Sequence, residues 1–131
     1  MSVLAIESSC DESAAAIFDP AFGVRESLVH SQTDLHALYG GVVPDLASSE
    51  HLKKLPALVA MIAKSEHFSS VGEIAATNGP GLPNCLAIGV AAASALALKL
   101  GLPLRGVNHL RGHAYSCLLY TSDAADDLIG V

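Results

Sequence analysis

Basic residues are scarce in this chain. It has 7 lysine and arginine residues against 13 aspartate and glutamate residues, which gives a formal net charge of -6 at pH 7. Only Lys53 and Lys54 are adjacent. Proteins that bind nucleic acid unaided normally gather lysine and arginine on one surface. The composition therefore argues against nucleic-acid binding by this chain alone, and an RNA partner would need a surface from other residues or from another subunit.

Cysteines and long apolar runs are also few. Cys10, Cys85 and Cys117 have no CxxC spacing, so we expect three reduced thiols and neither a disulfide framework nor a cysteine-based zinc site. No uninterrupted apolar run approaches the roughly 20 residues that a membrane span needs. The first residues lack the features of a secretory signal or a transit peptide. We expect a cytoplasmic protein with no membrane partner.

Apolar periodicity and turn residues predict alternating strands and helices. Three strands come first and form a meander, and crossovers through helices follow, which is typical of an α/β fold with a mixed sheet flanked by helices. We expect Pro56 to kink or divide the first long helix, and the second, rich in Ala and Leu, to be buried on most sides. The expected strands are 2–7, 14–18, 24–31, 73–78 and 104–107, and the expected helices are 44–68, 84–100 and one beginning near His109 after an Asn108 cap.

Two histidines stand four residues apart near the end of the chain. On a helix, His109 and His113 project from the same face, close enough for both imidazoles to bind one metal ion. The alternative is a pair of histidines on a solvated helix start. Leu110 follows the first histidine where a zinc protease of the H-E-x-x-H type needs its glutamate base. The pair therefore lacks the base of that mechanism.

Two loops are candidates for ligand binding. The segment 8–12 places hydroxyls and two carboxylates after the first strand, where phosphate or magnesium binding would suit them, although a self-satisfied polar turn fits equally well. No activating group adjoins Cys10, so we do not expect a nucleophile there. The segment 78–83 contains Gly79 and Gly81, whose freedom allows backbone amides to point at a ligand. It has neither a Walker ending nor a GxGxxG pattern, so a tight structural turn is the alternative.

Four segments, taken in their order along the chain, resemble the TsaD family, formerly called O-sialoglycoprotein endopeptidases or glycoproteases. They are A-I-E-S-S-C-D-E-S at 5–13, S-Q-x-x-x-H-x-x-Y-G-G-V-V-P at 31–44, N-G-P-G-L at 78–82 and G-V-N-H-L-x-G-H at 106–113. The resemblance implies the first lobe of an actin-like ATPase fold, of the ribonuclease H-like class, over residues 1–115. Residues 116–131 match nothing expected of the family, and we interpret them as a foreign tail, an artefact of sequencing or assembly.

The resemblance also implies a function. Family members transfer a threonylcarbamoyl group from threonylcarbamoyl-AMP to the adenosine next to the anticodon of tRNA, forming threonylcarbamoyladenosine (t6A), and bacterial members work with a TsaB-like scaffold and a TsaE-like ATPase. One divalent metal ion, Fe²⁺ or Zn²⁺, and ATP or threonylcarbamoyl-AMP are the implied ligands. We expect this chain alone to be inactive, with a non-catalytic TsaB-like scaffold or a metalloendopeptidase as alternatives. The implied site residues are His109 and His113 on the metal, Asp11 and Glu12 in catalysis, and Ser8, Ser9, Gly79 and Gly81 near the substrate or nucleotide.

Overall fold

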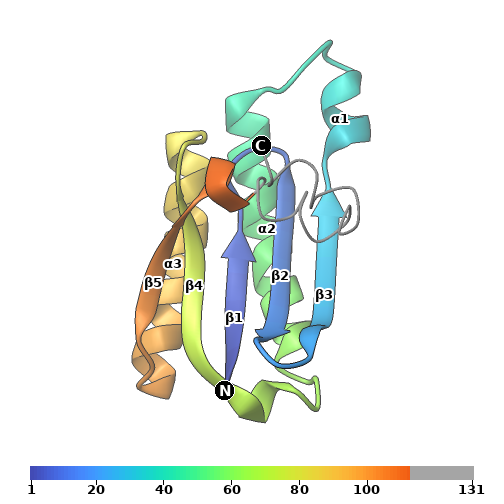
Figure 1. Cartoon of the computed structure of the whole chain (residues 1–131). Coiled ribbons are helices and arrows are strands. Elements are labelled where there is room, and N and C mark those ends of the chain that lie inside the picture. The colour runs from blue at the N-terminus through green and yellow to red at the C-terminus, as the bar shows by residue number, and fades with distance from the viewer. Residues whose placement is uncertain (113–131) are drawn as a thin grey trace, which may run out of the picture.

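A five-stranded mixed sheet organises the protein in the computed structural model, which describes residues 1–112 (Figure 1). The strand order is β3-β2-β1-β4-β5. β1 pairs antiparallel with β2 and parallel with β4, while β2–β3 is antiparallel and β4–β5 parallel. The elements are β1 Ser2–Glu7, β2 Glu12–Asp19, β3 Gly23–Ser31, α1 Thr33–Ala37, α2 Pro44–Ile62, the 3-10 turn Phe68–Ser70, β4 Val71–Gly79, α3 Pro83–Leu100 and β5 Leu104–Asn108.

The core lies between the sheet and two helices. α2 and α3 pack against each other and against the sheet, and Figure 1 shows both behind the same face of it. Alternation in β1 and β2 sends every second side chain toward these helices, because successive side chains of a strand point to opposite faces. The fully or almost fully buried aliphatic side chains there are Leu4, Ile6, Ile17, Leu55, Ile62 and Ile74.

The predicted order of strands and long helices is confirmed, including the meander of β1, β2 and β3. The division of the first long helix is wrong, since α2 runs through Pro56 as one helix and ends at Ile62. Leu55 and Ile62, which flank this proline, both belong to the same buried cluster. Both parts of α2 thus pack against the core, and this packing compensates for the backbone hydrogen bond that is lost at proline. α1 was not expected from the sequence.

The expectation that the second long helix is buried on most sides is also wrong. α3 buries only a narrow stripe of small residues, Cys85, Gly89, Ala93 and Ala97, spaced four apart. This spacing places them on one side of the helix, whereas Leu98 is 86% exposed. By length and composition α3 is apolar enough to cross a membrane, and 22% of it is buried inside the structure. A single helix of this kind is weak support for a membrane span.

Helix α3 ends as the sequence indicates. Gly101 is its left-handed C-cap, with φ of 66°, a conformation that favours glycine. The amide of Leu102 then donates to the carbonyl of Ala97. This sharp ending returns the chain to β5, which carries Asn108 and the following histidine to the carboxyl edge of the sheet.

Candidate functional site

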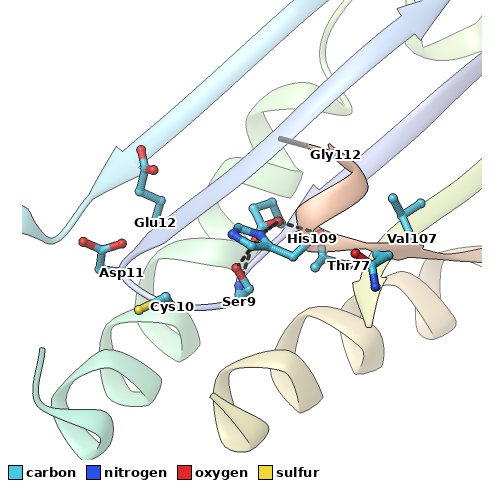
Figure 2. A pocket seen from close by; sticks show the side chains of 10 residues that line it. Ser9, Cys10, Asp11, Glu12, Thr77, Val107, His109 and Gly112 are labelled. Atoms are coloured by element: carbon cyan, nitrogen blue, oxygen red, sulfur yellow. Dashed lines mark hydrogen bonds and ion pairs between the residues drawn. The ribbon is translucent and has the colours of Figure 1, made fainter. Parts of the chain in front are cut away.

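A cavity of about 540 Å³ opens at the carboxyl ends of the three parallel strands (Figure 2). Ligand sites of open α/β sheets commonly lie at this edge, because the loops that leave the strands meet there. β1, β4 and β5 each contribute residues at or near their ends, and the loop from β1 to β2 closes one side. The lining residues are Glu7, Ser9, Cys10, Asp11, Glu12, Thr77, Val107, Asn108, His109 and Gly112.

The backbone of the loop between β1 and β2 accepts hydrogen bonds from three other segments of the chain. The carbonyl of Ser9 accepts a hydrogen bond from the amide of Leu82 at 2.8 Å, and the carbonyl of Asp11 accepts from the amide of Gln32 at 2.8 Å. From α2, Nε2 of His51 donates to the carbonyl of Cys10 at 2.7 Å. These contacts fix the backbone that presents the carboxylates of Asp11 and Glu12 along the cavity.

His51 ties the same loop to the core. Its side chain is fully buried, and its Nδ1 lies 2.6 Å from the hydroxyl of Ser13 in β2. Because Nε2 donates to a carbonyl, which can only accept, a neutral His51 receives the Ser13 proton on Nδ1. Both ring nitrogens are therefore satisfied in the protein interior.

His109 begins a helical turn at the cavity wall. The side-chain oxygen of Asn108 accepts hydrogen bonds from the amides of Leu110 at 2.9 Å and Arg111 at 3.1 Å. This geometry confirms Asn108 as the N-cap. His113, the other predicted metal ligand, lies outside the described residues, as do Cys117 and the tail 116–131.

A hydrogen-bond network joins His109 to the end of β1. Nδ1 of His109 lies 3.2 Å from Oε2 of Glu7 and 3.0 Å from Oγ of Ser9. Oε2 of Glu7 also accepts a hydrogen bond from Oγ1 of Thr77 at 2.6 Å, and Oε1 accepts one from the amide of Ser9. Figure 2 shows His109, Ser9 and Thr77 converging from three separate elements.

The network also sets the ionisation of Glu7. Partial burial favours the neutral acid and raises the pKa, but hydrogen bonds from Ser9, Thr77 and His109 outweigh it, so the net pKa of Glu7 is lowered. The opposite holds for Cys10, whose thiol pKa is raised by burial and by the nearby charges of Asp11 and Glu7. A raised pKa disfavours the thiolate, which agrees with the expectation that Cys10 is no nucleophile. Cys10 and Cys85 are both free thiols.

The structure separates the predicted site residues into two groups. Ser9, Asp11, Glu12 and His109 line one cavity, whereas Ser8, Gly79 and Gly81 do not. The buried hydroxyl of Ser8 donates to the carbonyl of Cys85 at 2.7 Å and so joins β1 to α3. Gly81 allows the loop after β4 to approach the loop after β1, because a Cβ there would lie 2.6 Å from the carbonyl oxygen of Ser9.

Sequence reasoning missed Glu7, Thr77 and His51. Glu7 ends an apolar strand and Thr77 lies inside another, so the pattern alone describes them as strand residues. The available signal for Glu7 was an acidic residue at the carboxyl end of a buried strand, beside the polar loop. His51 had only its place on the apolar face of a helix as a signal.

No group of three or more histidine, cysteine, aspartate or glutamate side chains has metal-binding geometry within residues 1–112. The chemistry of His109 nevertheless suits a metal ligand. A carboxylate contacts its Nδ1, and metal-binding histidines typically direct their second ring nitrogen at such a partner. The described residues thus fit one ligand of an incomplete set.

Solved structures of similar fold define the class. "YeaZ from Pseudomonas aeruginosa" superposes with a TM-score of 0.56 at 21% identity, over 82% of this chain and 42% of that chain. An "uncharacterized protein with similarity to peptidase YEAZ from Pseudomonas aeruginosa" gives 0.56 at 24% identity, over 82% and 43%. The protein is a mixed α/β protein with the actin-like fold of these neighbours, which confirms the expected fold class.

Sequence relatives then identify the family. The family model "TsaD: tRNA N6-adenosine threonylcarbamoyltransferase" matches residues 23–127, and the chain belongs to this family. Relatives of that name from Aromatoleum aromaticum and Salinibacter ruber are 48% and 50% identical over 91% and 88% of this chain. The chain spans about a third of their length, 35% in both cases. The matched range extends beyond residue 115, and the foreign tail at 116–131 stays a prediction.

Proposed function

We propose that the complete gene product transfers a threonylcarbamoyl group from threonylcarbamoyl-AMP to the exocyclic amine of the adenosine next to the anticodon of tRNA, forming t6A. The observation that carries this proposal is the meeting of Asp11, Glu12 and His109 on one cavity in a chain of the TsaD family. The names of the relatives describe this transfer to adenosine N6.

Asp11 and Glu12 are the proposed catalytic residues. In the reaction the amine nitrogen forms a bond to the carbamoyl carbon, the bond from that carbon to the phosphate oxygen breaks, and AMP leaves. The amine gives up a proton, and a carboxylate beside the cavity is suited to accept it or to stabilise the positive charge that develops on nitrogen. Both side chains line the cavity, Asp11 from the loop after β1 and Glu12 from the start of β2, and the carbonyls of Ser9, Cys10 and Asp11 accept hydrogen bonds that fix this backbone.

His109 is a proposed metal ligand, together with His113 and a third ligand outside this chain. A bound Fe²⁺ or Zn²⁺ would supply Lewis-acid chemistry that orients and polarises the phosphate or carbamoyl group. The chain's own contribution is to hold His109 at the cavity wall through the Asn108 cap and the contacts to Glu7 and Ser9. ATP or threonylcarbamoyl-AMP would occupy the same cavity, with Ser9 nearby.

The proposed partners are tRNA, a TsaB-like scaffold subunit and a TsaE-like ATPase, in the cytoplasm. The net charge of -6 supports an assembly in which other residues or subunits supply most of the tRNA-binding surface. An apolar hollow between α2 and α3 supports a protein partner, because contiguous exposed apolar surface often marks an interface. Its lining residues are Leu52, Leu55, Pro56, Ala87, Ile88, Ala91 and Ala92.

Complementation tests the function and the two carboxylates together. A bacterial strain depleted of its own t6A enzyme receives the complete gene product, the Asp11→Asn variant or the Glu12→Gln variant, and t6A in hydrolysed tRNA is quantified by mass spectrometry. We expect t6A from the unchanged protein and a fall of about 10²–10⁴-fold in the transfer rate of each purified variant, the range for a lost acid or base.

Asp34→Asn is the matched control, because Asp34 lies in α1 and does not line the cavity. It should restore t6A fully. The 131-residue chain expressed alone should restore none. No t6A from the complete gene product would refute the function, while full activity of both carboxylate variants would refute only their catalytic role.

A further inference from the structure

We propose that Glu7 is a positioning residue that fixes the tautomer of His109, keeping the proton on Nδ1 and the lone pair on Nε2. This inference deepens the proposed function and rests on it for the role of His109 as a metal ligand. It comes from the contacts at the end of β1, where Oε2 of Glu7 lies 3.2 Å from Nδ1.

The tautomer of His109 follows from which partners of Nδ1 can donate a hydrogen bond and which can only accept one. Both carboxyl oxygens of Glu7 already act as acceptors, Oε2 from the hydroxyl of Thr77 and Oε1 from the amide of Ser9, and a carboxylate offers only acceptor oxygens. A hydroxyl can donate or accept. If Nδ1 of His109 carried a lone pair, Ser9 could donate to it at 3.0 Å, but the carboxylate of Glu7 would face that lone pair without a proton between them. If Nδ1 carries the proton, both contacts are attractive. The carboxylate of Glu7 therefore selects the tautomer of His109, whereas the hydroxyl of Ser9 can form a hydrogen bond with either one.

Glu7 can act in this way because its own carboxylate is held in place. Thr77 donates to the same oxygen, Oε2, at 2.6 Å from the neighbouring strand β4, and the amide of Ser9 donates to the other oxygen. Both oxygens thus accept a hydrogen bond, one from a side-chain hydroxyl on β4 and one from a backbone amide. A carboxylate restrained on both oxygens orients the imidazole as well as its proton.

The consequence concerns metal binding. A neutral imidazole binds a metal through the nitrogen that lacks a proton, so a proton fixed on Nδ1 leaves Nε2 as the ligand atom. Loss of the carboxylate partner of a metal-binding histidine typically costs about 10–100-fold in metal affinity. Glu7 would accordingly tune the metal site without contacting the metal.

The test reads the tautomer directly, in the complete gene product labelled with ¹⁵N-histidine and stripped of metal. Imidazole ¹⁵N shifts distinguish the two neutral tautomers, and a His109→Gln variant assigns the signal. We expect the Nδ1-protonated form in the unchanged protein and a shift toward Nε2 protonation in Glu7→Ala. Glu7→Gln, which retains an acceptor oxygen, should recover part of the original signal. Glu73→Gln removes a carboxylate of β4 that pairs with Arg105 instead, and should change nothing.

Zinc titration of the same proteins forms the second arm. We expect Glu7→Ala to weaken Zn²⁺ binding about 10–100-fold, His109→Ala to abolish it and Glu73→Gln to leave it unchanged. An Nε2-protonated His109 in the unchanged protein, or Zn²⁺ binding unaffected by Glu7→Ala, would overturn the positioning role. A third outcome separates the two proposals: the expected tautomer is observed, but Zn²⁺ binds equally well to His109→Ala. This result would support the orientation of His109 by Glu7 and would refute His109 as a metal ligand.

Discussion

The interior and the carboxyl end of strand β1 belong to different chemical settings. Leu4 and Ile6 point into an apolar core shared with α2 and α3, where neighbours are held by packing alone. Glu7, one residue further, enters a polar network with Ser9, Thr77 and His109. The core therefore supplies the stability of the lobe, whereas the polar edge is free to carry chemistry because it contributes little apolar burial.

The largest expected effect on stability comes from the core. Leu55→Ala removes a fully buried side chain between α2 and the sheet, and we expect the free energy of unfolding to fall by about 2–5 kcal/mol because a cavity remains. Urea denaturation of the complete gene product measures the loss. Leu52→Ala, on the same helix at 66% exposure, is the control and should stay within about 0.5 kcal/mol of the unchanged protein. Equal losses in both variants would contradict the placement of the core.

His51 connects the two settings, so its replacement should disturb both. His51→Leu leaves the buried hydroxyl of Ser13 without a partner, at a cost of about 1–3 kcal/mol, and releases the carbonyl of Cys10 beside Asp11. We expect lower stability in urea together with slower transfer by the proposed site. His30→Leu is the control, because His30 is half-exposed and contacts Glu50 at 3.8 Å. A loss of stability with an unchanged transfer rate would mean that His51 stabilises the core and does not affect the proposed site.

The core could be predicted from the sequence because its signal is local. Alternation identifies Leu4 and Ile6, and each needs only its immediate neighbours to be recognised. The Glu7–His109 contact joins residues 102 positions apart, so no periodicity can reveal it. Ser9, Asp11 and Glu12, which line the cavity, could be proposed from the sequence because a polar cluster after a buried strand is itself a local pattern.

The two wrong predictions, about α3 and α2, also came from local patterns. α3 was expected to be buried on most sides because its composition is apolar all round, but only the side that faces the sheet is buried. Pro56 was expected to kink or divide α2 because local propensity disfavours proline inside a helix, yet tertiary packing of Leu55 and Ile62 keeps it whole. Local rules thus describe preferences that contacts across the fold can override.

A smaller effect is expected at the N-cap that presents His109. Asn108→Ala removes the acceptor of the Leu110 and Arg111 amides and should cost about 1 kcal/mol of stability in urea. Asn108→Asp keeps an acceptor oxygen and should retain most of that stability. If both variants behaved like the unchanged protein, the cap would not hold the turn, and other contacts, among them those to Glu7 and Ser9, would orient His109.

The smallest effect concerns Asp19, at the turn between β2 and β3, which belongs neither to the buried cluster nor to the cavity lining. The hydrogen bond from the amide of Ala21 lowers its pKa, and that of Phe22, the amino terminus and Ser2 add to the effect. A folded-state pKa below the unfolded value means that the ionised group stabilises the protein above the unfolded pKa, about 3.9. That stabilisation is lost as the pH falls through the folded-state pKa. Asp19→Asn cannot ionise, so its deficit in urea midpoint should be present at pH 6 and should shrink as the pH falls below about 4. A deficit that stays constant with pH would mean that the charge of Asp19 contributes nothing and that only the shape of the turn matters.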